Sequence, residues 1–267
     1  MRYSCVLPDP ATYSDWRDFE ADLASVKRAG CEAVELQIAD PAFVDDARLR
    51  AALGVSGLPL CAVQTGQTYA TRGNCLCTAN EPIRRRTIDL LLSFVDFAAL
   101  WGAVVVFGSL QGQLSDEPDR EVGATRIREA MCEVGAYATG KGVTLAFEPV
   151  QHGEVGFHNT IAEVERVVRS LGLEGVRMMV DTFHLNIEER DMIAPLVGIR
   201  DILAHVHLSE TNRGCLGEGH WPTAAFLREL ECGGYSGWCS IGVYNSRLPH
   251  AERVARSMAA VRACEAR

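Results

Sequence analysis

The sequence predicts an α/β fold, a closed (β/α)8 barrel (TIM barrel), and three observations lead to this prediction. Apolar runs of about six residues recur eight times, and each is followed by a segment with helical periodicity. Strands that alternate with helices form parallel sheets, because a parallel pair needs a crossover connection. The length, 267 residues, is close to the roughly 250 residues of a typical barrel. We expect a single domain over residues 1–267.

The predicted strands and helices follow this alternation along the chain. The strands are residues 3–7, 33–38, 58–65, 103–108, 143–148, 176–181, 203–208 and 238–243. The helices are residues 16–29, 45–53, 83–101, 121–140, 160–171, 188–197, 224–231 and 250–263. Several helices precede a glycine, at residues 30, 102, 140–142 and 172, which suits a left-handed helix end. The alternative is an open doubly wound sheet, but no G-x-G-x-x-G follows the first strand.

Composition limits the partners and the compartment. The formal net charge is −9, which repels phosphate backbones and anionic membrane surfaces, so we expect neither nucleic acid nor membrane as a partner. No stretch approaches the roughly 18 apolar residues of a membrane span, and the amino terminus lacks a signal-peptide pattern. Several of the ten cysteines lie in apolar strand-like runs, where a thiol acts as a small hydrophobe. We therefore expect a cytoplasmic protein.

Three potential metal ligands lie at the ends of consecutive predicted strands. Glu148, Asp181 and His207 end the fifth, sixth and seventh strands, and the carboxyl ends of barrel strands carry the catalytic groups. Two carboxylates and an imidazole suit a divalent ion of intermediate hardness, such as Mn²⁺, Co²⁺, Mg²⁺ or Zn²⁺, and the lack of thiolate argues against structural zinc. Each acid taken alone fits a helix cap or an ion pair equally well. Their recurrence on three strands favours a metal site.

Several motifs in order resemble a known family. They are QTGQTYATRG (64–73), AFEPV (146–150), VDTFHLNIEE (180–189), HVHLSETNRG (205–214), LGEGH (216–220) and GYSGW (234–238). With intervals of 33 and 26 residues between the three ligands, the chain resembles the xylose isomerase-like barrels, and among them the sugar epimerases related to D-tagatose 3-epimerase. The resemblance implies one divalent ion, with Mn²⁺ first, bound by Glu148, Asp181 and His207. It also implies that Glu148 is a catalytic base.

The resemblance further implies how a sugar is bound. His184 matches a substrate-binding histidine, Arg213 an arginine at the carbonyl end of the sugar, and Glu154 a polar contact to substrate. Each has a structural alternative: a hydrogen bond in the barrel mouth for His184, an ion pair with Glu210 for Arg213, and a solvated loop charge for Glu154. Glu35 fits either the pocket wall or a buried ion pair. Dimers and tetramers are common in the family, so a homo-oligomer is implied.

One position departs from the family. The eighth strand should end in a second glutamate that completes the metal site and serves the opposite face of the sugar, but this chain has Gly242 there. Proton abstraction next to a carbonyl then has Glu148 on one face, with the other face open to water. Three hypotheses follow: an impaired isomerase or epimerase, a lyase or keto-glycoside-cleaving enzyme that needs one base, or a non-catalytic sugar-binding protein.

A nuclease is the contrasting class. Apurinic endonucleases share the barrel and use metals, but they need a larger set of histidine and carboxylate ligands and a basic surface. The chain has seven histidines and an acidic balance. The sequence therefore favours the sugar enzyme.

Overall fold

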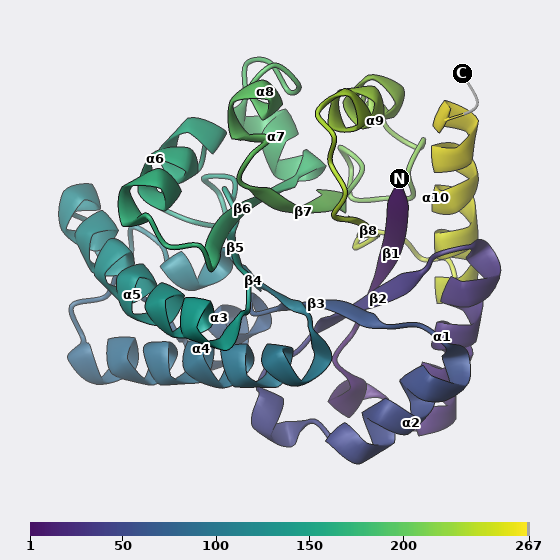
Figure 1. The fold of residues 1–267 in the computed structure, drawn as a ribbon, viewed down its shortest axis with the longest axis horizontal. Helices are drawn as coiled ribbons and strands as arrows, with labels where there is room; N and C mark the ends of the chain where they lie inside the picture. Colours follow the sequence, from purple (N-terminus) through teal and green to yellow (C-terminus); the bar gives the residue numbers. More distant parts are fainter. Residues whose placement is uncertain (266–267) are drawn as a thin grey trace.

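In a computed structural model that describes residues 1–265, eight parallel strands close into a barrel in sequence order, with helices around the outside (Figure 1). The strands are β1 (Arg2–Leu7), β2 (Ala33–Gln37), β3 (Leu60–Gln64), β4 (Val104–Phe107), β5 (Leu145–Phe147), β6 (Val176–Asp181), β7 (Leu203–Leu208) and β8 (Trp238–Ile241). The predicted (β/α)8 barrel is confirmed. No helix within residues 1–265 is both long and apolar enough to cross a bilayer.

Capping side chains and glycines mark several ends of the helices. They are α1 (Trp16–Ala29), α2 (Asp46–Ser56), α3 (Gln67–Arg72), α4 (Glu81–Trp101), α5 (Arg120–Lys141), α6 (Ile161–Leu171), α7 (Thr182–Glu188), α8 (Leu196–Ile199), α9 (Thr223–Cys232) and α10 (His250–Glu265). Thr160 and Glu163 form a capping box that starts α6. Gly142 ends α5 with φ of 67°, a left-handed conformation that costs glycine little.

One predicted helix is wrong. Residues 188–197 do not form a helix, because α7 already ends at Glu188 and α8 begins only at Leu196. Asp181 starts α7 earlier than predicted, since its side chain accepts a hydrogen bond from the Phe183 amide. Between the two helices the Asp191 side chain accepts from the amides of Ile193 and Ala194, both at 2.9 Å. Such local bonds favour a turn over a helix.

The inside of the barrel contains polar side chains, all fully buried. Ser4 and Ser240 lie 2.5 Å apart between their hydroxyl oxygens, and Ser240 Oγ lies 3.2 Å from His205 Nε2. Glu35 on β2 joins this group across the barrel from β7. A buried polar group is costly unless it is hydrogen-bonded, so this chain of contacts stabilises the packing of the interior. Through Glu35, this group also contacts His207 at the carboxyl end of the barrel.

Candidate active site

Strands β5, β6 and β7 bring three side chains together at the carboxyl end of the barrel. Glu148 follows β5, Asp181 ends β6 and His207 lies in β7, where it is the register partner of Asp181. All three are buried, and a ligand atom of each lies within 4.8 Å of the other two. His207 Nδ1 is 3.7 Å from Asp181 Oδ2 and 3.9 Å from Glu148 Oε1. The donor set, two carboxylates and one imidazole, fits a divalent ion of intermediate hardness.

Glu148 has room at this place because Gly108 follows β4. A Cβ atom at position 108 would lie 2.6 Å from Glu148 Oε2 and 2.8 Å from Val150 Cγ2. Any larger residue would therefore require the side chain of Glu148 or Val150 to shift. The glycine after β4 thus determines where the glutamate after β5 can lie.

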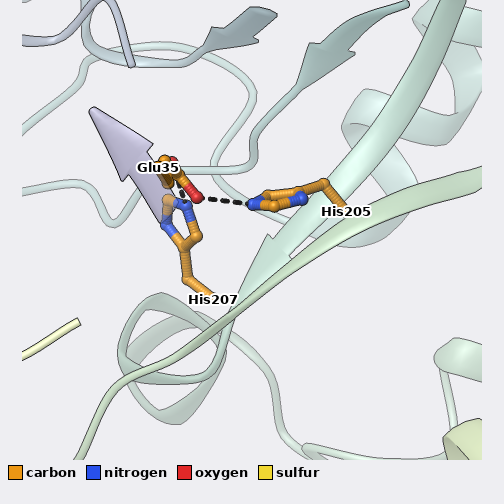
Figure 2. A group of neighbouring side chains, drawn as sticks. All are labelled: Glu35, His205 and His207. Atoms are coloured by element: carbon orange, nitrogen blue, oxygen red, sulfur yellow. Dashed lines mark hydrogen bonds and ion pairs between the residues drawn. The ribbon is translucent and has the colours of Figure 1, made fainter. Parts of the chain in front are cut away.

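Glu35 lies between two imidazoles, those of His205 and His207, and contacts both (Figure 2). Its Oε2 is 2.7 Å from His205 Nε2, and its Oε1 is 2.8 Å from His207 Nε2. Glu35 and His205 are fully buried, so Glu35 is the buried ion-pair partner that one of its two interpretations predicted. Since Nε2 of His207 is engaged, Nδ1 is the nitrogen that faces Asp181 and Glu148. A partner of this kind fixes the tautomer and direction of a metal-binding histidine.

His205 was not predicted as part of the site. It is fully buried and lies two residues before His207 on the same strand. Side chains two apart on a strand share a face. The alternating HVH of β7 was therefore a signal that His205 and His207 point into the barrel together.

The two glutamates that flank His207 have pKa values shifted in opposite directions. Burial raises the pKa of Glu148 to about 8, with a further increase from the neighbouring Asp181 that His207 and Arg213 counteract. Burial would also raise the pKa of Glu35, but His207 and His205 outweigh it and hold the pKa well below the usual range. Burial would lower the pKa of His207, but Glu35 raises it well above the ordinary value. The same buried surroundings therefore lower the pKa of Glu35 and raise that of Glu148.

Arg213 organises the loop side of the site. Its Nη1 donates to Asp181 Oδ2 at 2.8 Å, and its guanidinium lies 3.9 Å from the ring centre of Phe183. Burial would raise the pKa of Asp181, yet Arg213 and His207 hold it well below its usual range. Arg213 has a left-handed backbone with φ of 61°, an uncommon conformation for a residue with a side chain.

The three predicted sugar contacts lie in one group. His184 Nε2 is 3.3 Å from Arg213 Nη2 and 3.8 Å from Glu148 Oε1. Glu154 Oε1 lies 3.9 Å from Arg213 Nη2. The alternative pairing of Arg213 with Glu210 is wrong, since Glu210 accepts hydrogen bonds from backbone amides of its own loop. A role in sugar binding stays a prediction for all three.

A polar pocket of about 590 Å³ opens above the cluster. Its wall includes the three ligands and the three predicted sugar contacts, together with Gln37, Gln64, Gln67, Tyr69, Ser109, Gln113 and Tyr244. Amides and hydroxyls of this kind suit a ligand rich in hydroxyl groups. The pocket volume is within the range of small-molecule sites.

A protein-family model described as xylose isomerase-like TIM barrel matches residues 23–264. The chain belongs to this family. It is 27% identical over 216 residues to a ketose 3-epimerase of Arthrobacter globiformis, covering 79% of this chain and 72% of that protein. It is 28% identical over 234 residues to an L-ribulose 3-epimerase of Mesorhizobium japonicum, covering 86% and 77%. A 3-keto-D-glucoside 4-epimerase from E. coli in its apo form superposes with a TM-score of 0.84 at 19% identity, covering 99% and 100%.

The eighth strand of this xylose isomerase-like barrel has a tyrosine beside Gly242. The ring of Tyr244, a residue that is 41% exposed, lies against this glycine. A Cβ atom at position 242 would lie 2.8 Å from Tyr244 Cε2 and 3.1 Å from both Tyr244 Oη and Ser209 Oγ. A glutamate introduced at position 242 would therefore need the tyrosine to move. Burial and the charge of Asp181 raise the pKa of Tyr244.

Proposed function

We propose that the chain is a divalent-metal-dependent sugar isomerase or epimerase that removes a proton from the carbon next to a carbonyl. The observation that carries this proposal is the convergence of Glu148, Asp181 and His207 at the base of one polar pocket. A carboxylate at such a place can act as a general base. The similarity to ketose and L-ribulose 3-epimerases supports this chemistry.

Glu148, Asp181 and His207 would hold the ion. We expect Mn²⁺ first, with Mg²⁺, Co²⁺ and Zn²⁺ as alternatives, because these ions accept mixed carboxylate and imidazole ligands. When bound, the ion supplies Lewis-acid polarisation of the carbonyl and stabilises negative charge on its oxygen. Glu35 keeps His207 Nδ1 turned toward Asp181 and Glu148 through its 2.8 Å contact with Nε2.

The side chains of the pocket have separate tasks in this proposal. Glu148 accepts the proton from the sugar carbon, since it lines the pocket in which the sugar would lie. Arg213 and His184 lie next to each other on the same side of the pocket and orient the sugar through its oxygens. Glu154, beside Arg213, accepts a hydrogen bond from a sugar hydroxyl.

We infer a ketose or a related keto-sugar as substrate. The names of the ketose 3-epimerase, the L-ribulose 3-epimerase and the 3-keto-D-glucoside 4-epimerase each describe inversion at a carbon beside a ketone. The likeness to the third protein is one of fold, at 19% identity. An uncharged sugar fits best, since no phosphate-binding G-x-x-x-x-G-K-[ST] loop occurs in the sequence.

The experiment removes metal with a chelator, restores Mn²⁺, and presents ketohexoses, ketopentoses and 3-keto-glycosides. We expect metal-dependent inversion at one carbon, detected by NMR. An unsaturated or cleaved product would favour the lyase or keto-glycoside-cleaving alternative. Binding of a sugar without turnover would favour the non-catalytic alternative.

Metal content separates the sugar enzyme from a nuclease. One ion per chain agrees with the proposal, and three ions with cleavage of abasic DNA would contradict it.

A further inference from the structure

The residue that fills the space beside Gly242 is a further catalytic candidate. Resting on the proposed function, we propose that Tyr244 is the proton donor on the face of the sugar opposite Glu148. Inversion of a carbon needs a second acid or base, because the proton must leave from one face and return to the other. The position of the phenol supports this role.

Tyr244 and the base come from different sides of the barrel rim. Glu148 follows β5 and Tyr244 follows β8, and β6 and β7, which carry Asp181 and His207, lie between these strands. Both side chains line the same pocket. A sugar bound between them would present one face to the carboxylate and the other to the phenol.

The backbone fixes the tyrosine in this place. The amides of Tyr244 and Asn245 both donate to the carbonyl of Arg213, at 3.0 and 2.8 Å. The ring centre of Tyr244 lies 4.8 Å from the Arg213 guanidinium, a distance typical of a cation–π contact. Since Gly242 has no side chain, the ring can lie over the end of β8 without a clash. These contacts hold the residue, which is 41% exposed, at the wall of the pocket.

Other acidic groups of the pocket are placed for other tasks. Glu154 lies on the loop after β5, the same side as Glu148, beside Gln151 and Arg213. Asp181 accepts hydrogen bonds from the Phe183 amide and from Arg213.

The second tyrosine of the pocket is also engaged elsewhere. Tyr69 donates its hydroxyl to Asp116 at 2.8 Å. The Tyr244 phenol is therefore the acid that remains on the β8 side of the pocket.

Glu148 and Tyr244 together account for every proton that is transferred. Glu148 takes the proton from the carbon next to the carbonyl, and the C–H electron pair enters the enediolate. Tyr244 then gives its O–H proton to the opposite face of that carbon, which leaves a tyrosinate and a protonated Glu148. Proton exchange with water returns both groups to their starting state, and no oxidant or reductant is needed. An ordinary phenol has a pKa of about 10, so it carries the required proton at neutral pH.

The test is the Tyr244→Phe variant assayed in D₂O with Mn²⁺ and a panel of ketohexoses and ketopentoses. Phenylalanine keeps the ring against Arg213 and removes only the hydroxyl. We expect inversion to fall by about 10²- to 10⁴-fold, the usual loss for a general acid. Deuterium should still enter the unreacted sugar without inversion, because Glu148 remains. The matched control is Tyr137→Phe, which removes a hydroxyl bonded to Asp96 on the outer helices at 2.8 Å and should leave both rates unchanged.

The outcomes separate the donor role from the proposed function. Inversion by Tyr244→Phe at the wild-type rate overturns the donor role and leaves the proposed function standing. Equal loss of inversion and deuterium exchange also overturns it, because the tyrosine would then serve binding. If the wild-type chain neither exchanges nor inverts any sugar, the proposed function fails and the donor role falls with it.

A second variant, Gly242→Ala, keeps the phenol and displaces it, since the new Cβ would lie 2.8 Å from the ring. A smaller loss of inversion than in Tyr244→Phe, with exchange retained, supports the inference. Unchanged inversion in Gly242→Ala contradicts the argument from position.

Discussion

Glu35 and Glu148 are both buried glutamates beside the same imidazole, yet their pKa values shift in opposite directions. Glu35 contacts two imidazole nitrogens at 2.7 and 2.8 Å, whereas the imidazole nitrogens nearest to Glu148 lie 3.8 and 3.9 Å away. The pKa of Glu35 is therefore held well below its usual range, and that of Glu148 is raised to about 8. Close hydrogen bonds decide whether a buried carboxyl is charged. Glu35 suits a fixed support, and Glu148 suits a group that exchanges a proton.

The largest effect we expect is loss of turnover in Glu148→Gln. An amide keeps the shape of the side chain but cannot accept the carbon-bound proton, so kcat for inversion should fall by about 10²- to 10⁴-fold. Steady-state assay of the reaction measures this. Glu133→Gln is the control, because Glu133 is half-exposed on α5 and pairs with Arg85. Turnover within a few-fold of wild type would contradict the assignment of the base.

Glu35→Gln should act through metal binding. Removing a partner that orients a ligating histidine lowers metal affinity by about 10- to 100-fold. Breaking a buried ion pair also costs about 3–5 kcal/mol of unfolding free energy. Calorimetric titration with Mn²⁺ and urea unfolding measure the two effects. If stability falls while Mn²⁺ affinity stays at the wild-type level, Glu35 supports the barrel and not the metal site.

The affinity for Mn²⁺ should rise with pH. A metal binds the ionised carboxylate, and the pKa of Glu148 is raised to about 8, so binding below that pH must displace its proton. Binding should strengthen about tenfold from pH 6 to 7 and less steeply as the pH approaches 8, and His207, whose pKa is also raised, adds to the slope. Titrations at several pH values test this, and the slope should be smaller in Glu148→Gln. A flat profile would show that Glu148 is already ionised.

The smallest effect belongs to His205→Gln. This change leaves the contact between Glu35 and His207 in place and substitutes an amide donor for one imidazole. Mn²⁺ affinity should fall by less than about tenfold, well below the loss in Glu35→Gln. The same calorimetric titration measures it. An equal loss in the two variants would mean that Glu35 acts as part of the whole buried group and not mainly through His207.

Sequence patterns were enough to predict the barrel and the three side chains that meet at its rim. Apolar runs alternate with helical segments, and Glu148, Asp181 and His207 each end such a run, so their common rim follows from local periodicity and parallel topology. The helix predicted over residues 188–197 failed because cap and turn hydrogen bonds of Asp181 and Asp191 overrode weak periodicity. Boundaries depend on such local bonds.

Residues distant along the chain decided the rest. Glu35 and His207 are 172 positions apart, and only closure of β2 and β7 into one barrel brings them together. Tyr244 lies at the pocket because amides of its loop donate to the carbonyl of Arg213 and its ring lies beside Gly242. The sequence by itself determined the strands, their order and the residues at their ends, because these depend on short-range pattern. Only the tertiary structure decided which glutamate has a lowered pKa and which side chain lies beside Gly242, because burial and hydrogen bonding are properties of the assembled barrel.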